Sequence, residues 1–130
     1  MNRPVWSVLT ACLVLAAGCA STSQYAKEDC PLYAELGPLV ANPAGAIEHR
    51  LRVEVTLRVC PPEEGLAEVQ RKRIELKHHL LALLSSKSTA ELNDPLRVEN
   101  LQKEIRTLVN QRVLKKGRVV EVYITQFELQ

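Results

Sequence analysis

The fold is decided by the stretch LRVEVTLRV, residues 51–59. Apolar residues stand at every second position and alternate with arginine, glutamate and threonine. Successive side chains of a strand point to opposite faces, so the pattern predicts a β-strand with one buried and one solvent-facing side. Two prolines follow at 61–62 and cannot donate to a β-ladder, which ends the strand.

Helical patterns follow this strand. Between residues 63 and 84, apolar residues recur at helical spacing, which predicts one long, well-buried helix. Residues 88–91, Ser-Thr-Ala-Glu, have the spacing of a capping box and predict a short helical turn. The Asp-Pro pair at 94–95 predicts the start of another helix, since aspartate caps helices and proline suits their first turn. Lys-Lys-Gly at 115–117 closes that helix.

Two more strands are expected, near the two ends of the domain. Residues 36–42 give a short one, and residues 119–129, rich in β-branched and aromatic side chains, give a longer one that pairs with residues 51–59. The order β-β-α-(short α)-α-β predicts an α+β fold, a small sheet of three to four strands covered by two main helices. Tyr123 and Phe127 are an even number of positions apart, so both are expected on one face as cover or core.

The first residues predict a targeting segment. Arg3 precedes an apolar run of about 13 residues from Val5 to Ala17, whereas a membrane-spanning helix needs about 20. The run ends in LAAGC, which resembles a bacterial lipobox because small residues precede a cysteine whose thiol can carry a diacylglycerol. We therefore expect residues 1–18 to be a signal peptide and Cys19 to be the lipidated first residue of the mature protein.

The segment after this cysteine predicts a tether. Residues 19–31 are expected to be the lipidated cysteine and the tether, and residues 32–130 a single periplasmic domain. The tether is small and polar, without an apolar period. Residues 20–31 reach at most about 40 Å when fully extended. A lipid anchor and a short tether keep the domain close to one membrane face.

The chain has four cysteines with separable roles. Cys12 leaves with the signal peptide, Cys19 is acylated, and Cys30 and Cys60 remain in the domain. In an oxidising compartment a disulfide between them would close a loop of about 30 residues, worth roughly 3–4 kcal/mol on the chain-entropy model. Two free buried thiols are the alternative, and the sequence leaves both states open. A metal or catalytic role is disfavoured.

The composition argues against several classes of partner. The formal net charge is only +2, and charges of both signs are interspersed, so nucleic acid is not expected. Aromatic residues make up 4% of the chain, too few for a base-stacking or sugar-binding surface.

The sequence contains no catalytic or metal-binding pattern that we regard as functional. No phosphate-binding loop, nucleophile elbow or zinc motif occurs in the sequence. His78 and His79 point about 100° apart on a helix and cannot share one ion. Ser85 and Ser86 end a helix, where hydroxyls satisfy free backbone groups. We expect neither an enzyme nor a bound cofactor, metal ion or small-molecule substrate.

Four blocks carry a family resemblance. They are YAELGPLVAN at 33–42, LLSSKSTAEL at 83–92, LQKEIRTLVN at 101–110 and VYITQFELQ at 122–130. In this order and spacing they resemble FliL, the flagellar basal body-associated family, over nearly the whole mature chain. The resemblance implies a fold similar to the stomatin (SPFH) domain. The matched positions, expected to fix local structure and core, are Asn42, Leu84, Ser85, Ser86, Asn110, Tyr123, Phe127 and Gln130.

The resemblance also implies a function through contacts and no chemistry. FliL-like domains assemble side by side into rings that surround a stator unit of the flagellar motor and support motility. We therefore expect a homo-oligomer at the inner-membrane basal body, with stator proteins as partners. The chain departs from the family in one respect, because family members are usually held by a transmembrane helix and not by a lipid.

An alternative is an envelope lipoprotein that uses this fold as an adaptor or scaffold unrelated to flagella. Ala20 follows the lipid cysteine, where enteric bacteria place an aspartate to retain a lipoprotein at the inner membrane. Sorting to the outer membrane would favour this alternative.

Overall fold

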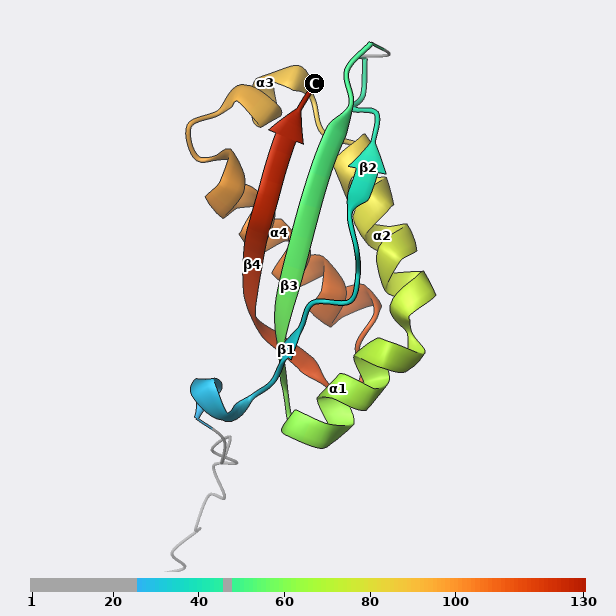
Figure 1. Cartoon of the computed structure of the whole chain (residues 1–130), viewed down its shortest axis with the longest axis vertical. Helices are drawn as coiled ribbons and strands as arrows, with labels where there is room; N and C mark the ends of the chain where they lie inside the picture. Colours follow the sequence, from blue (N-terminus) through green and yellow to red (C-terminus); the bar gives the residue numbers. More distant parts are fainter. Residues whose placement is uncertain (1–25, 46–47) are drawn as a thin grey trace, which may run out of the picture.

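The computed structural model describes residues 26–45 and 48–130 (Figure 1). The expected signal peptide and Cys19 lie outside the described residues. The elements in chain order are η1 (Lys27–Asp29), β1 (Leu32–Tyr33), β2 (Leu39–Ala41), β3 (Leu51–Cys60), α1 (Pro62–Arg71), α2 (Arg73–Ser85), α3 (Thr89–Asn93), α4 (Arg97–Arg112) and β4 (Arg118–Leu129). The predicted α+β class is confirmed.

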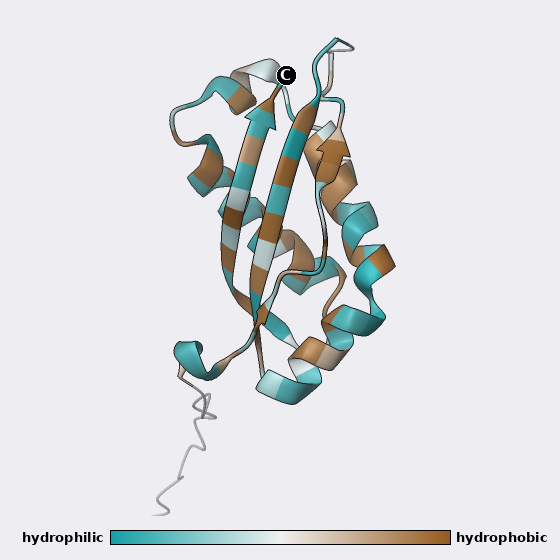
Figure 2. Cartoon of the chain, viewed as in Figure 1, coloured by the Kyte–Doolittle hydropathy of each residue, from teal (hydrophilic) through white to brown (hydrophobic). Residues whose placement is uncertain are grey.

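β3 is the centre of the sheet. It pairs antiparallel with β1 and β2 along one edge and with β4 along the other. The predicted pairing of the last strand with residues 51–59 is confirmed, from Leu51 opposite Leu129 to Cys60 opposite Arg118. Figure 2 shows the alternation along β3 as bands of brown and teal, and the apolar side chains are the buried ones.

The helices cover one face of this sheet. α1 packs against β3, α2 against β2 and α4 against β4. The core between them contains Leu51, Val53, Val55, Leu57, Val59, Val69, Leu76, Leu80, Leu84, Leu101, Ile105 and Val109. No helix of the described chain lies in front of β3 and β4 in Figure 1. The polar sides of these two strands therefore form an open face.

The prediction of one long helix over residues 63–84 is wrong, because the chain forms α1 and α2, which meet at Lys72. α1 packs against β3 and α2 against β2, so the chain must change direction between them. Lys72 Nζ donates to the carbonyl oxygen of Val113 at 2.8 Å and holds the bend. No glycine or proline marks this position, so the periodicity alone did not indicate a break.

The predicted start of α3 is confirmed, whereas the predicted start of α4 is not. The capping box is confirmed, since Ser88 Oγ accepts from the Glu91 N–H at 3.2 Å and the Ser88 N–H donates to the Glu91 carboxylate at 3.3 Å. α4, however, begins only at Arg97. Asp94 Oδ1 accepts from the N–H of Leu96 at 2.7 Å, so this aspartate forms a turn before the helix instead of capping it.

The first strand is shorter than residues 36–42. Leu36 is fully buried, but the chain turns at Gly37, whose φ of +70° lies in the left-handed region that glycine tolerates. β2 begins only after this turn, and β1 precedes it as a strand that the sequence pattern did not indicate.

Tyr123 and Phe127 lie on opposite faces of the sheet, and the prediction that they share one is wrong. The register of β4 against β3 shifts between Glu54 and Val55, where Thr125 is an extra residue. Tyr123 therefore pairs with Thr56, and Phe127 with Val53. Paired residues of an antiparallel ladder share a face, so Tyr123 is on the open face and Phe127 faces the helices. An extra bulge residue reverses the alternation beyond it.

A buried contact, here called the α1–β4 junction, joins α1 to the turn before β4. It comprises Gly65, Glu68, Lys72 and residues 115–117. The Glu68 carboxylate is 2% exposed and accepts from the three backbone N–H groups of residues 115–117 at distances between 2.8 and 3.2 Å. Lys72 Nζ lies 3.4 Å from it. Burial alone would raise the pKa of Glu68, but these backbone donors and Lys72 outweigh it and hold the pKa below its usual value.

Two glycines allow the backbones of the α1–β4 junction to approach each other. A methyl group at Gly65 would stand 2.7 Å from the carbonyl oxygen of Cys60, and one at Gly117 would stand 2.7 Å from the Cα of Gly65. Both distances are shorter than carbon atoms tolerate, so any side chain would separate α1 from the two strands.

Candidate anchoring site

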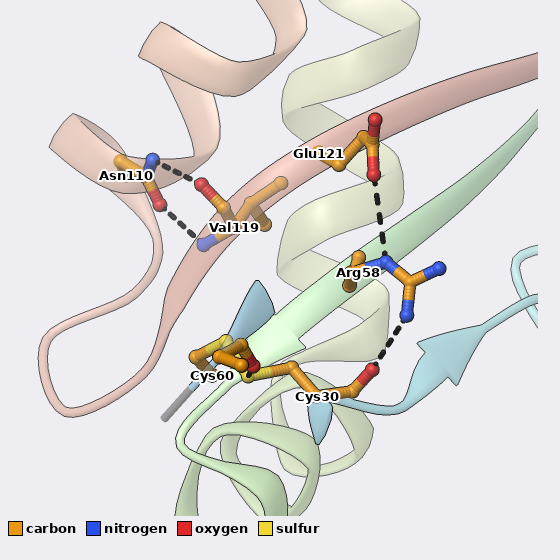
Figure 3. Close-up of a disulfide and its surroundings, with 7 residues drawn as sticks. Cys30, Arg58, Cys60, Asn110, Val119 and Glu121 are labelled. Atoms are coloured by element: carbon orange, nitrogen blue, oxygen red, sulfur yellow. Dashed lines mark hydrogen bonds and ion pairs between the residues drawn. A yellow bond between two sulfur atoms is a disulfide. The ribbon is translucent and has the colours of Figure 1, made fainter. Parts of the chain in front are cut away.

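The N-terminal chain is fastened to the sheet where it enters the domain. The N–H of Val59 donates to the carbonyl oxygen of Pro31 at 3.1 Å, and β1 continues the pairing with β3. A disulfide joins Cys30 to Cys60, with 5.2 Å between their Cα atoms (Figure 3). Of the two states that the sequence left open, the structure has the bonded one. We call this region the anchoring site and define it as Lys27, Cys30, Arg58, Cys60, Glu121 and Tyr123.

Arg58 is the centre of the polar contacts in the anchoring site. It projects from β3 onto the open face, and Figure 3 shows its guanidinium between Cys30 and Glu121. One terminal nitrogen donates to the carbonyl oxygen of Cys30 at 2.9 Å, and the other donates to the Tyr123 hydroxyl at 3.4 Å. Nε lies 3.5 Å from the Glu121 carboxylate. One side chain thus joins the incoming chain to β4.

Glu121 adds a second connection. Its carboxylate lies 2.9 Å from Lys27 Nζ, in η1, and accepts a hydrogen bond from the Tyr123 hydroxyl. The Tyr123 hydroxyl and then Lys27 stabilise the charged form, so the pKa of Glu121 lies below its usual value. Residues 27–31, which the sequence assigns to the tether, are therefore bonded to the sheet by a disulfide, an ion pair and backbone hydrogen bonds.

Asn110 is the matched family position with the clearest structural role. Its side-chain amide donates to the carbonyl oxygen of Val119 at 2.9 Å and accepts from the Val119 N–H at 2.8 Å (Figure 3). A neighbouring strand would offer the same donor and acceptor to β4. Asn110 thereby ties α4 to the free edge of β4 next to the turn between them.

The remaining family positions are dispersed over the domain. Leu84 is buried in the core, and Ser86 Oγ donates to the carbonyl oxygen of Leu83 at 2.7 Å, as expected for a hydroxyl at a helix end. Phe127 packs at the edge of the core beneath the guanidinium of Arg97, 5.6 Å from its ring centroid.

Three further family positions are exposed. Gln130 pairs with Arg50 through both backbone groups at 2.8 Å, whereas Ser85 ends α2 in solvent. The Asn42 side chain makes no hydrogen bond to any residue that the structure describes. The structure brings Tyr123 into the anchoring site and leaves the other family positions outside it.

Lys87 is an internal link that the sequence pattern did not indicate, although it stands in the LLSSKS block at 83–88. It is buried, its ammonium lies 3.1 Å from Glu91 and also pairs with Glu104, and its carbonyl oxygen accepts from the Ala44 N–H. Burial alone would lower the pKa of Lys87, but the two carboxylates raise it above its usual value. Lys87 thus connects the end of α2 with α3, α4 and the loop after β2.

Metal-binding clusters and membrane-spanning helices are both absent from the part of the chain that the structure describes. Within residues 26–45 and 48–130, no three histidine, cysteine, aspartate or glutamate side chains are grouped so that they could hold a metal ion. None of the helices in this part of the chain has the length and apolar character needed to cross a membrane. Arg58, Glu68 and Glu121 could not be singled out from the sequence, because charged residues at those positions fit an ordinary solvated surface.

These features define a small α+β domain in which one sheet face is covered by helices and the other receives the N-terminal chain. The family described as flagellar basal body-associated protein FliL matches residues 33–130. The chain belongs to the FliL family. Membership points to a flagellar basal body-associated protein of the bacterial envelope. The match includes Arg58, Cys60, Glu121 and Tyr123, and it begins after Lys27 and Cys30.

A curated relative agrees with this assignment. The chain is 33% identical over 79 residues to the flagellar protein FliL of Aquifex aeolicus (strain VF5). The alignment covers 61% of this chain and 48% of that protein, so the chain spans about half the length of the relative it matches.

Proposed function

We propose that the chain is a lipid-anchored accessory protein of the flagellar basal body that acts by contacting other proteins and performs no chemistry. Family membership supports the flagellar role. The anchoring site is the observation that supports the manner of attachment, because it fixes Lys27 and Cys30 to the sheet. Only residues 20–25 then separate the expected lipid on Cys19 from the first described residue, Ala26. Seven Cα–Cα steps span at most about 25 Å.

The proposal includes a homo-oligomer that surrounds and supports a stator unit. Copies held by short tethers on one membrane face have a high effective concentration, so individually weak contacts between neighbours add up. Support comes from the fixed place at which the N-terminal chain enters the domain, since Cys30 and Lys27 are bonded to the sheet. A short tether and a fixed place of entry suit side-by-side assembly at a fixed height above the bilayer.

Deletion and co-isolation test this role. Deletion of the gene is expected to reduce swimming and swarming, and the wild-type protein is expected to co-purify with stator proteins after mild crosslinking. Cys19→Ser is expected to release the protein from the membrane fraction and to abolish complementation. Normal motility in the deletion strain together with no stator association would reject the motor role. Full complementation by the released variant would reject the anchor.

Ala20 favours a second candidate, an envelope scaffold unrelated to the motor. Membrane fractionation separates the two roles. Recovery with the inner membrane supports the motor role, whereas recovery with the outer membrane supports the scaffold. A tether of at most about 25 Å keeps the domain beside the membrane that holds the lipid, so its partners are expected at that membrane.

A further inference from the structure

We propose that a basic groove between α4 and the start of β4 binds an extended acidic segment of a partner protein. The groove is a hollow of about 670 Å³ lined by Arg106, Thr107, Gln111 and Arg118, together with Asn110 and the apolar Val119 and Val120. No carboxylate is among its lining residues. This inference goes beyond the role proposed above and depends neither on the lipid nor on the stator.

The charge distribution around the basic groove is one-sided. Residues 105–120 contain five arginines and lysines and no acidic residue, although the whole chain is nearly balanced at 17 basic to 15 acidic residues. Within the described chain, Arg106 and Arg118 form no ion pair, in contrast to Arg58, Lys72 and Lys87. Exposed like charges repel one another, and a polyanion relieves that repulsion on binding.

The nearby carboxylates do not neutralise the groove, because two of them have other partners. Glu68 lies under the turn before β4 and accepts from three backbone N–H groups, while Glu121 is paired with Lys27 in the anchoring site. Glu99 and Glu121 line a second hollow of about 270 Å³, which adjoins the basic groove and shares Arg106 and Val120 with it. The uncompensated positive charge is therefore concentrated at the Arg106–Arg118 end.

The shape of the groove favours a peptide over a bilayer surface. Lys103 lines the adjoining hollow, so the lining residues of α4 extend from Lys103 through Arg106 to Gln111, a distance of about 12 Å at the helical rise. This length accommodates about four residues of an extended chain. The charges surround a recess, and the Thr107 hydroxyl and Gln111 amide add donors that a backbone or carboxylate can use. A flat lipid surface would reach only the protruding residues.

A fluorescent octaglutamate peptide serves as the probe, with octaglutamine as its neutral counterpart. The full-length protein in detergent is expected to bind octaglutamate and to lose affinity as salt rises from about 50 to about 300 mM. The R106A/R118A double variant is expected to bind at least about tenfold more weakly. The matched control R50A/K77A removes the same charge from residues outside the groove and is expected to change affinity less than about twofold.

Any of three results overturns the proposal. The wild-type protein does not bind octaglutamate, it binds octaglutamine equally well, or the two double variants lose the same affinity for octaglutamate. Phosphatidylglycerol vesicles provide a further arm: if they bind through Arg106 and Arg118 while octaglutamate does not, the surface is a lipid site and the peptide proposal is wrong. Thermal unfolding followed by circular dichroism checks that both double variants are folded, which is expected because Arg50, Arg106 and Arg118 are exposed and Lys77 is only half-buried.

Discussion

The anchoring site and the α1–β4 junction fasten chain segments to the same end of the β3–β4 pair by opposite means. The first lies on the open face and uses a disulfide and partly exposed ion pairs. The second lies on the helix side and uses a buried carboxylate and two glycines. A change at the open-face site is expected to act locally unless it breaks the covalent bond, whereas any change at the buried site lowers the stability of the whole domain.

The largest expected effect comes from removing the covalent bond. Replacing Cys30 and Cys60 together by serine opens a loop of about 30 residues in the unfolded chain and is expected to lower the free energy of unfolding by about 3–4 kcal/mol. Urea unfolding of the variant and the wild type, with and without a dithiol reductant, measures this difference. An unchanged midpoint, together with labelling of both thiols in the untreated wild type, would show that the bond is absent from the purified protein.

Glu68→Gln is expected to lower the free energy of unfolding by about 2–3 kcal/mol, since a buried charge-assisted network is replaced by weaker neutral hydrogen bonds. The matched control is Glu64→Gln, an exposed position on the same helix, which is expected to change stability by less than about 0.5 kcal/mol. Chemical unfolding at neutral pH measures both. Similar values for the two variants would contradict the role assigned to Glu68.

Acid is expected to weaken the α1–β4 junction through the same carboxylate. The folded-state pKa of Glu68 is lowered, so its contribution is fully present above the unfolded pKa of about 4.3 and is lost as the pH falls below that value through the folded pKa. Unfolding free energies measured from neutral pH down to about pH 3 test this. In Glu68→Gln, the decrease of the free energy of unfolding with falling pH is expected to be smaller than in the wild type. Identical pH profiles for variant and wild type would contradict the linkage.

Gly65→Ala tests the close approach of α1 to the strands. In an ordinary helix this substitution stabilises by up to about 1 kcal/mol. Here the added methyl group meets the Cys60 carbonyl oxygen, so we expect a loss of about 1–2 kcal/mol. Gln70→Ala, at an exposed site on α1, is the control. A gain in stability at Gly65 would show that the helix and the strand can separate at little cost.

The smallest global effect is expected from Arg58→Ala. The disulfide still holds the chain, so overall unfolding should change little, while the segment from Lys27 to Cys30 loses one of its attachments. Faster tryptic cleavage after Lys27 measures this local opening. Arg52→Ala, on the same strand and face, is the control. Equal cleavage in both variants would argue against a specific role for Arg58.

The sequence predicts the parts of this fold that depend on periodic burial. Leu51 to Val59 alternate strictly, so both the central strand and its partner were predictable. The bulge at Thr125, the bend at Lys72 and the burial of Glu68 were not, because each depends on contacts between residues distant in sequence. Within the anchoring site, Cys30 and Cys60 were recognisable as a pair, but nothing in the alternation distinguished Arg58 from Arg52.

The side chain of Asn110 has a consequence for how copies of this domain can meet. β4 pairs with β3 along one edge, and its outer edge has no partner strand in the described chain. Such an edge invites another strand to add to it, which leads to uncontrolled association. At Val119 the amide of Asn110 already occupies the backbone donor and acceptor that an incoming strand would need. Addition of a strand at Val119 is therefore blocked, and a second copy that meets this end of β4 is expected to contact it through side chains.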